Sequence, residues 1–146
     1  MGFDKTMSAG YLANHMARLF FNALAERIKP LGLAPAQFMT LLELWAEDGL
    51  TQKDLVARLD VEQATMANTL ARMERDGLVV RRPHVRDKRA QSIWLTEHAR
   101  TLQGPATEAA RSVNALALAE LSDAERAQFL SSMNRTIAAL RKAASA

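Results

Sequence analysis

Basic side chains are concentrated between Arg72 and Arg89, the stretch of the chain with the clearest chemical character. This stretch holds seven basic residues against three acidic ones, an excess of four positive charges, whereas the whole chain carries only +3. Clustered arginine and lysine are typical of proteins that contact nucleic acid phosphates, although a charged stretch can also be a plain solvated surface. The basic residues are Arg72, Arg75, Arg81, Arg82, Arg86, Lys88 and Arg89.

Small and amide-bearing side chains precede and overlap this basic stretch. Along a helix predicted over residues 62–76, the outward face consists of Gln63, Ala64, Ala67, Asn68 and Arg72. Small side chains let a helix approach a DNA groove closely, and amides hydrogen-bond to base edges. For the amides alone, a solvated helix face is an equally good interpretation. Together, the two patterns predict DNA contacts by Gln63, Thr65, Asn68, Arg72, Arg86, Lys88 and Arg89.

Two short helices are predicted to hold these side chains. The first begins at Thr51, a favourable N-cap residue. The second turns Met66, Leu70 and Met73 inward, at the spacing of one helix face, and ends at Gly77.

A β-hairpin is predicted directly afterwards. Residues that favour strands at 79–80 and 93–95 flank a loop that contains the turn residues Pro83 and Asp87. Three of the basic side chains then lie at or near the tip of the hairpin. Helix, helix and charged hairpin in this order predict a winged helix-turn-helix that reads duplex DNA.

Residues 50–100 closely resemble the MarR family of bacterial transcription regulators, and a looser resemblance covers nearly the whole chain. The most specific matches are MERDGLV at 73–79 and the run Asp87, Lys88, Arg89. The resemblance implies that the second helix enters the major groove and that Arg89 enters the adjacent minor groove, where a narrow groove attracts a guanidinium. It also implies that Asp87 pairs with basic side chains and orients them.

The same resemblance implies a mainly α fold with a small β-wing, in one domain over residues 1–146 with its DNA-binding lobe at 33–95. The chain differs from many members at Ala64 and Asn68, where those members carry Ser and Arg. Its base preference therefore cannot be taken from a relative.

Amphipathic helices are predicted on both sides of this lobe. Apolar residues at helical spacing indicate helices over 8–29 and 35–48. After Thr96, a good N-cap, a long helix is expected, with a kink or break at Gly104 and Pro105. A capping box at 122–125 begins the last helix.

These flanking helices carry more apolar surface than the DNA-binding lobe can cover, so a partner chain is expected, although packing within one chain is the alternative. The family resemblance implies a homodimer in which helices at 8–29 and 106–142 interlock. A two-fold dimer reads two half-sites about one helical turn apart, so the predicted partner is double-stranded DNA with a palindromic operator.

Several classes of protein are disfavoured by what the sequence lacks. The chain has no cysteine, and its three histidines lack the spacing of metal ligands, so we expect no metal and no cofactor. Since the motifs of hydrolases, nucleotide-binding enzymes and zinc proteases are absent, we expect no enzyme. No segment resembles a signal peptide or a membrane span, which favours a cytoplasmic protein without membrane contact.

A small effector is suggested by four residues. Tyr11, His15 and Arg18 fall on one side of the first helix, and Trp45 lies near them if the second helix packs there. The resemblance implies a cavity between the dimer helices and the DNA-binding lobe for small phenolic or carboxylate anions, which aromatic walls and one cation would suit. The alternatives are a core role for Trp45 and an interface role for His15.

The predicted function is therefore a sequence-specific transcriptional regulator, a dimeric repressor released by a small aromatic anion. The competing interpretation is a winged helix that binds another protein without specific DNA binding, because a fold does not fix its function. Positive charge directed at both grooves of DNA favours the regulator.

Overall fold

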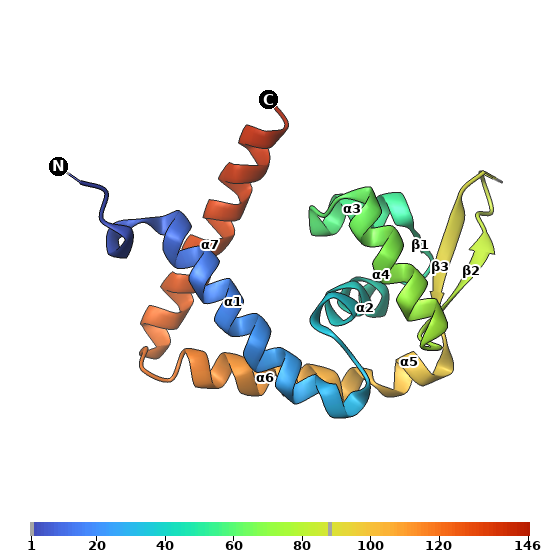
Figure 1. Cartoon of the computed structure of the whole chain (residues 1–146), viewed down its shortest axis with the longest axis horizontal. Helices are drawn as coiled ribbons and strands as arrows, with labels where there is room; N and C mark the ends of the chain where they lie inside the picture. The colour runs from blue at the N-terminus through green and yellow to red at the C-terminus, as the bar shows by residue number, and fades with distance from the viewer. Residues whose placement is uncertain (1, 88) are drawn as a thin grey trace. The chain divides into compact units, whose positions relative to one another are not determined.

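The computed structural model describes residues 2–87 and 89–146, in two compact units, Met1–Ala110 and Arg111–Ala146. The first unit contains a helix-turn-helix and a three-stranded antiparallel sheet, as Figure 1 shows. Its elements begin with η1 (Lys5–Met7), α1 (Ala9–Ile28), η2 (Lys29–Leu31), α2 (Pro35–Ala46) and β1 (Leu50–Thr51). They continue with α3 (Gln52–Leu59), α4 (Gln63–Arg75), β2 (Val79–Pro83), β3 (Gln91–Leu95), α5 (Glu97–Thr101) and the start of α6 (Gln103–Ala117). The mainly α fold with a small β-wing is confirmed.

The first helix of the helix-turn-helix starts where the sequence predicted. The Thr51 hydroxyl accepts the backbone N–H of Asp54 at 3.1 Å, and the Asp54 carboxylate accepts the backbone N–H of Thr51 at 3.0 Å. This reciprocal pair satisfies two donors that a helix start leaves free. Leu55 is fully buried beneath the helix.

The second helix, α4, buries the three residues that its sequence pattern predicted. Met66, Leu70 and Met73 are at most 2% exposed. Gly77 ends the helix in the left-handed conformation, with φ of 73°. Residues of α2 and β3, and residues at and just before the start of β2, complete the core around it, among them Leu41, Leu44, Leu78, Val79 and Ile93.

The hairpin that follows is the wing. In the antiparallel pair β2 and β3, Val79 lies opposite Leu95 and Arg81 opposite Ile93. The sequence predicts Pro83 in the loop, but the structure places it at the end of β2. The end of a strand tolerates a residue without a backbone N–H. The two-residue strand β1 pairs with the other edge of β3 as the third strand of the sheet, and the sequence did not predict it.

The flanking helices follow the prediction with one shift. Helices α1 and α2 lie within one or two residues of their predicted ends. The long helix predicted after Thr96 is broken at Leu102, which separates α5 from α6. The break lies two residues before Gly104, where the sequence predicts it. Thr96 caps α5 by accepting the backbone N–H of Ala99 at 3.2 Å.

The second unit consists of the rest of α6 and the long helix α7 (Asp123–Ala144). The predicted capping box is present, because Ser122 and Glu125 exchange two hydrogen bonds. The Arg126 side chain closes the preceding turn by donating to the carbonyls of Leu118 and Leu121. Among residues 2–87 and 89–146, no helix is both long and apolar enough to cross a bilayer.

Candidate DNA-binding surface

Helix α4 presents three differently built sides. Opposite its buried residues, the exposed stripe is Ala64, Asn68, Ala71 and Arg75. The predicted contact Arg72 is also exposed and lies beside this stripe, whereas Gln63 lies on the side toward α3. The backbone can approach a groove closely here, because two of the four residues at the centre are alanines.

The Gln63 side chain is held by a neighbour that sequence reasoning missed. The Gln52 amide nitrogen, at the start of α3, lies 3.2 Å from Gln63 Oε1 and 3.5 Å from the Gln63 backbone carbonyl oxygen. The partners are eleven residues apart, so only the turn between the two helices brings them together.

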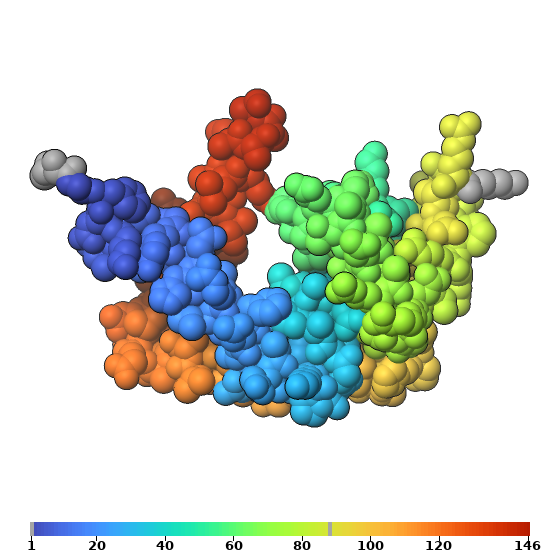
Figure 2. Space-filling view, viewed as in Figure 1, coloured from blue at the N-terminus to red at the C-terminus, as the bar shows by residue number. Residues whose placement is uncertain are grey.

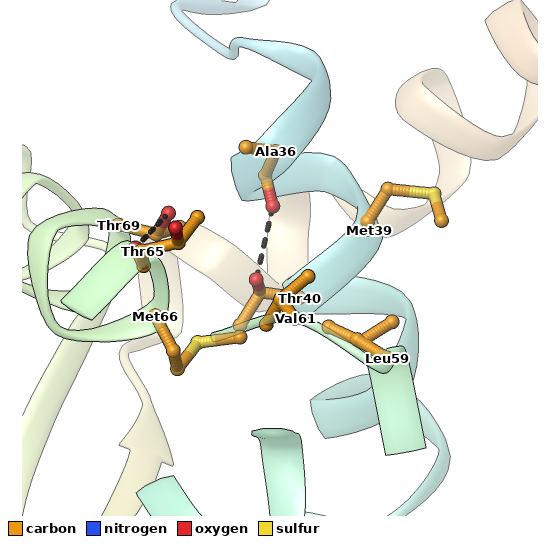
Figure 3. A pocket seen from close by; sticks show the side chains of 8 residues that line it. All are labelled: Ala36, Met39, Thr40, Leu59, Val61, Thr65, Met66 and Thr69. Atoms are coloured by element: carbon orange, nitrogen blue, oxygen red, sulfur yellow. Dashed lines mark hydrogen bonds between the residues drawn. The ribbon is translucent and has the colours of Figure 1, made fainter. Parts of the chain in front are cut away.

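Thr65 and Thr69 lie on the remaining side of α4, toward α2. Together with residues of α2 and the turn they line an apolar cavity of about 120 Å³, shown in Figure 3. The Thr69 hydroxyl donates to the Thr65 carbonyl, and the Thr40 hydroxyl across the cavity donates to the Ala36 carbonyl. Thr65 was predicted to contact DNA. Its side chain is exposed, and it also lies at the edge of this cavity.

The wing loop is organised by His84, which we had not assigned any role. Its Nδ1 atom accepts the backbone N–H groups of Arg86 and Asp87, both at 3.2 Å. The backbone N–H of His84 donates to the backbone carbonyl of Ala90, and this hydrogen bond closes the loop at its base.

The tip of the wing exposes the predicted cationic contacts. Arg86 and Arg89 are both exposed, and Lys88 lies outside the described residues. The Asp87 carboxylate accepts the backbone N–H of Arg89 at 3.0 Å, which fixes the turn. Among the described residues, Asp87 thus contacts the main chain of Arg89, whereas the resemblance had implied pairing with basic side chains.

The base of the wing is a stacked arrangement. The Arg82 guanidinium lies 5.2 Å from the centroid of the Trp94 ring, within the range of a cation–π contact. Trp94 Nε1 donates to the buried Ser92 hydroxyl at 2.8 Å, and its ring packs on Gly49, so both sides of the indole are fixed. In Figure 2 the wing is the yellow arm that projects beyond α3 and α4.

Ion pairs divide the basic residues into two groups. Arg75 pairs with Asp76 at 3.1 Å and Arg81 with Glu74 at 3.3 Å. Among the described residues, Arg72, Arg86 and Arg89 form no ion pair. Unpaired guanidinium groups are the ones free to bind phosphate, and these three come from α4 and the wing tip.

The end of α4 is fixed to the start of α2 by a buried amide. Gln37, only 6% exposed, accepts the backbone N–H of Ala34 through Oε1 and donates from Nε2 to the Asp76 carboxylate at 3.0 Å. The hydrogen bond from Gln37, followed by the one from Arg75, lowers the pKa of Asp76 below its usual range. This bond joins the C-cap of α4 to the first turn of α2.

The predicted effector residues are only partly brought together. Tyr11 and His15 form an edge-on ring pair with centroids 6.0 Å apart, and Arg18 lies exposed further along α1. Trp45 packs on Phe38 and donates from Nε1 to the Ala99 carbonyl at 3.1 Å. In the described part of the chain, no ring contact or hydrogen bond joins Trp45 to the residues of α1.

Comparison of this sequence with known proteins identifies the family to which the chain belongs. The MarR family profile matches residues 31–90. The Escherichia coli transcriptional regulator HosA is 32% identical over 98 residues, which cover 67% of this chain and 73% of HosA. The chain belongs to the MarR family of transcriptional regulators. Its members are DNA-binding winged helix proteins and not enzymes.

Other similar proteins match this chain over different lengths. The regulator TtmR of Methylorubrum extorquens is 40% identical over 97 residues, 66% of this chain but only 48% of TtmR, so the chain matches about half of that protein. The repressor Rv2887 of Mycobacterium tuberculosis is 27% identical over 88% of this chain and 93% of its own length. The Staphylococcus aureus MepR–DNA complex superposes with a TM-score of 0.82 at 25% identity, over 92% of this chain and 98% of MepR.

Proposed function

We propose that this MarR family regulator is a homodimeric repressor that reads a palindromic operator with α4 and the wing, and that a small aromatic anion releases it. The observation that carries the proposal is the set of guanidinium groups without ion pairs among the described residues, Arg72 on α4 and Arg86 and Arg89 at the wing tip, together with an exposed Asn68 on α4. A helix face with small and amide side chains reads bases, and charges around it bind phosphate. The MepR–DNA complex, the same fold bound to DNA, supports this use of the surface.

Exposed apolar residues support the dimer. On α1, Leu12, Leu19 and Phe21 are 47%, 58% and 53% exposed, and on α7, Ile137 and Leu140 are 51% and 66% exposed. Large apolar side chains at this exposure are costly to leave in water, and a second copy of the chain is the partner we propose for the helices at 8–29 and 106–142.

Repression is the proposed direction of regulation, because a dimer that occupies a promoter excludes polymerase without further contacts. The relative Rv2887 carries the name of a repressor, which supports this choice. The proposed effector is a small aromatic carboxylate bound near Tyr11, His15 and Arg18, with Trp45 as a further aromatic wall.

The test is binding to the DNA upstream of the protein's own gene, compared with random duplex of equal length. Gln63→Ala and Asn68→Ala should reduce the preference for the specific site more than they reduce binding to random duplex, because amides read base edges whereas charges bind any phosphate. An equal loss on both DNAs would contradict this assignment of roles. Binding that is insensitive to salt would favour the competing role of a protein-docking module.

A further inference from the structure

The cavity between α2 and α4 is built from uncharged residues. Its walls include the thioether side chains of Met39 and Met66 and the branched side chains of Leu59 and Val61, together with alanine and threonine (Figure 3). None of the described residues that line the cavity carries a charge, and Arg72, the first basic residue of α4, is not among them. A charged molecule there would lose its hydration without gaining a countercharge. The lining therefore favours an uncharged ligand.

Two of the three threonines at the cavity use their hydroxyl protons within their own helices. Thr40 donates to the Ala36 carbonyl at 2.9 Å, and Thr69 donates to the Thr65 carbonyl at 3.0 Å. Each hydroxyl can still accept a hydrogen bond, but neither has a proton left to donate to a ligand. Because an anion needs donors, these two threonines offer it nothing.

The volume of the cavity, about 120 Å³, sets the size of the ligand. Met66 is 2% exposed and Met39 is 49% exposed, so the cavity extends from the core to the surface. An engineered protein cavity of about 150 Å³ with apolar walls binds benzene. Poorly ordered water is displaced favourably by an apolar group. The cavity therefore suits a molecule with one six-membered ring.

We propose that this cavity binds a small, uncharged, apolar molecule of about the size of one six-membered ring, at a site separate from the one proposed for an aromatic anion. None of Tyr11, His15 and Arg18 lines the cavity. The ligand packs on the side of α4 that carries Thr65 and Thr69, beside the exposed stripe of this helix. Unbranched thioether side chains in the wall adapt to ligands of different shape.

The test compares toluene with benzoate, which share a ring and differ in a methyl group against a carboxylate. The full-length protein, isotope-labelled in its methionine methyl groups, is titrated with each compound and followed by NMR. Toluene should shift the Met39 and Met66 resonances to saturation and raise the melting temperature, because it binds the folded state. Benzoate at equal concentration should leave both resonances in place. Met39→Leu and Met66→Leu, which nearly conserve volume, assign the two resonances.

A pair of α4 variants locates the bound toluene. Thr69→Leu extends an apolar side chain at the cavity wall and should weaken toluene binding by about tenfold or more. Ala71→Leu is the matched control, because it adds the same side chain on the exposed stripe of α4, outside the cavity lining. It should change toluene binding by less than about twofold. Circular dichroism checks that both variants are folded.

Three results would overturn the proposal. The first is the absence of a saturable shift of either methionine up to the solubility limit of toluene. The second is equal toluene binding by the wild type and folded Thr69→Leu, and the third is a shift of the same resonances by benzoate at lower concentration than by toluene. If Thr69→Leu fails to fold, the two titrations of the wild type decide. Since they contain no DNA, their outcome is independent of the proposed function.

Discussion

Gly49 lies at a point where the backbone approaches a large side chain. Its φ is 78°, and a Cβ atom added there would come within 2.6 Å of the Trp94 ring. We predict that Gly49→Ala lowers the free energy of unfolding by roughly 2 kcal/mol or more, because strain and overpacking act together. Denaturant unfolding followed by circular dichroism measures this.

The matched control is Gly104→Ala in α6, where an added Cβ meets no atom within 4 Å. Alanine favours a helix over glycine by up to about 1 kcal/mol, so this variant should be neutral or more stable. Similar losses in both variants would show that Trp94 does not press on Gly49 in solution.

The Asp54 carboxyl makes the stability of the start of α3 depend on pH. The backbone N–H of Thr51 is the main cause that lowers the pKa of this carboxyl below its usual value. A carboxyl with a lowered folded-state pKa stabilises the fold above its unfolded value near 3.9, and this contribution disappears as the pH falls through the folded value. Asp54→Asn should therefore cost roughly 0.5 to 1 kcal/mol at pH 7.

The cost should shrink as the pH falls from about 5 to 3, because the wild-type carboxyl then becomes protonated as well. Unfolding curves at several pH values check this prediction. A cost for Asp54→Asn that stays constant down to pH 3 would contradict the role of its charge.

At the scale of elements, the wing has a stiff base and an exposed tip. Arg89 is free of ion pairs within the described chain, and its backbone N–H is fixed by Asp87. We predict that Arg89→Ala weakens specific binding by about 1 to 3 kcal/mol and reduces the salt slope by about one per half-site. Fluorescence anisotropy at several salt concentrations measures both quantities.

Arg100→Ala is the matched control, because Arg100 lies in α5, outside α4 and the wing, and already pairs with Asp48 and Glu97. It should change affinity and salt slope less than Arg89→Ala. Light scattering must show that both variants keep the oligomeric state of the wild type. If Arg89→Ala bound as tightly as the wild type, the wing tip would not contact DNA.

Elements set by local sequence were predictable, whereas those set by distant contacts were not. The N-cap at Thr51 and the buried face of α4 follow from neighbouring residues, and both are confirmed. Strand β1 has two residues and exists only because β3 pairs with it, so no local pattern marks it. The same reason hides the Gln37–Asp76 bond, which joins residues 39 positions apart.

The break at Leu102 shows how a correct signal can be misplaced by two residues. A continuous helix would press the Pro105 ring against the carbonyl of Thr101. Because α6 starts at Gln103, Pro105 instead occupies the third helical position, where a missing N–H costs nothing. Proline therefore forces the break upstream of itself and not at its own position.

At the scale of the whole molecule, release by an effector requires unequal affinity for the DNA-binding and the free arrangement of the dimer. A coupling of about 1 to 3 kcal/mol would lower operator affinity by roughly 5- to 150-fold. We predict that salicylate or a related aromatic carboxylate releases a preformed complex and that His15→Ala reduces this release. Titration of the acid against labelled operator measures the effect.

Trp45→Phe is the second variant to test beside His15→Ala. It keeps an aromatic ring against Phe38 and removes only the indole N–H that donates to the Ala99 carbonyl. Release that persists undiminished in both variants would place the effector elsewhere. If no aromatic acid acted on the wild type, the proposed effector class would be wrong while DNA binding stood.

The contact between Arg82 and Trp94 also gives this protein an intrinsic fluorescent reporter of DNA binding. The chain has two tryptophans, and Trp94 lies beneath the Arg82 guanidinium next to the proposed DNA surface. In a Trp45→Phe background, all indole emission would come from that one ring. Any duplex that draws Arg82 toward a phosphate changes the electric field on the indole, so its emission wavelength would report wing engagement in real time without an attached dye.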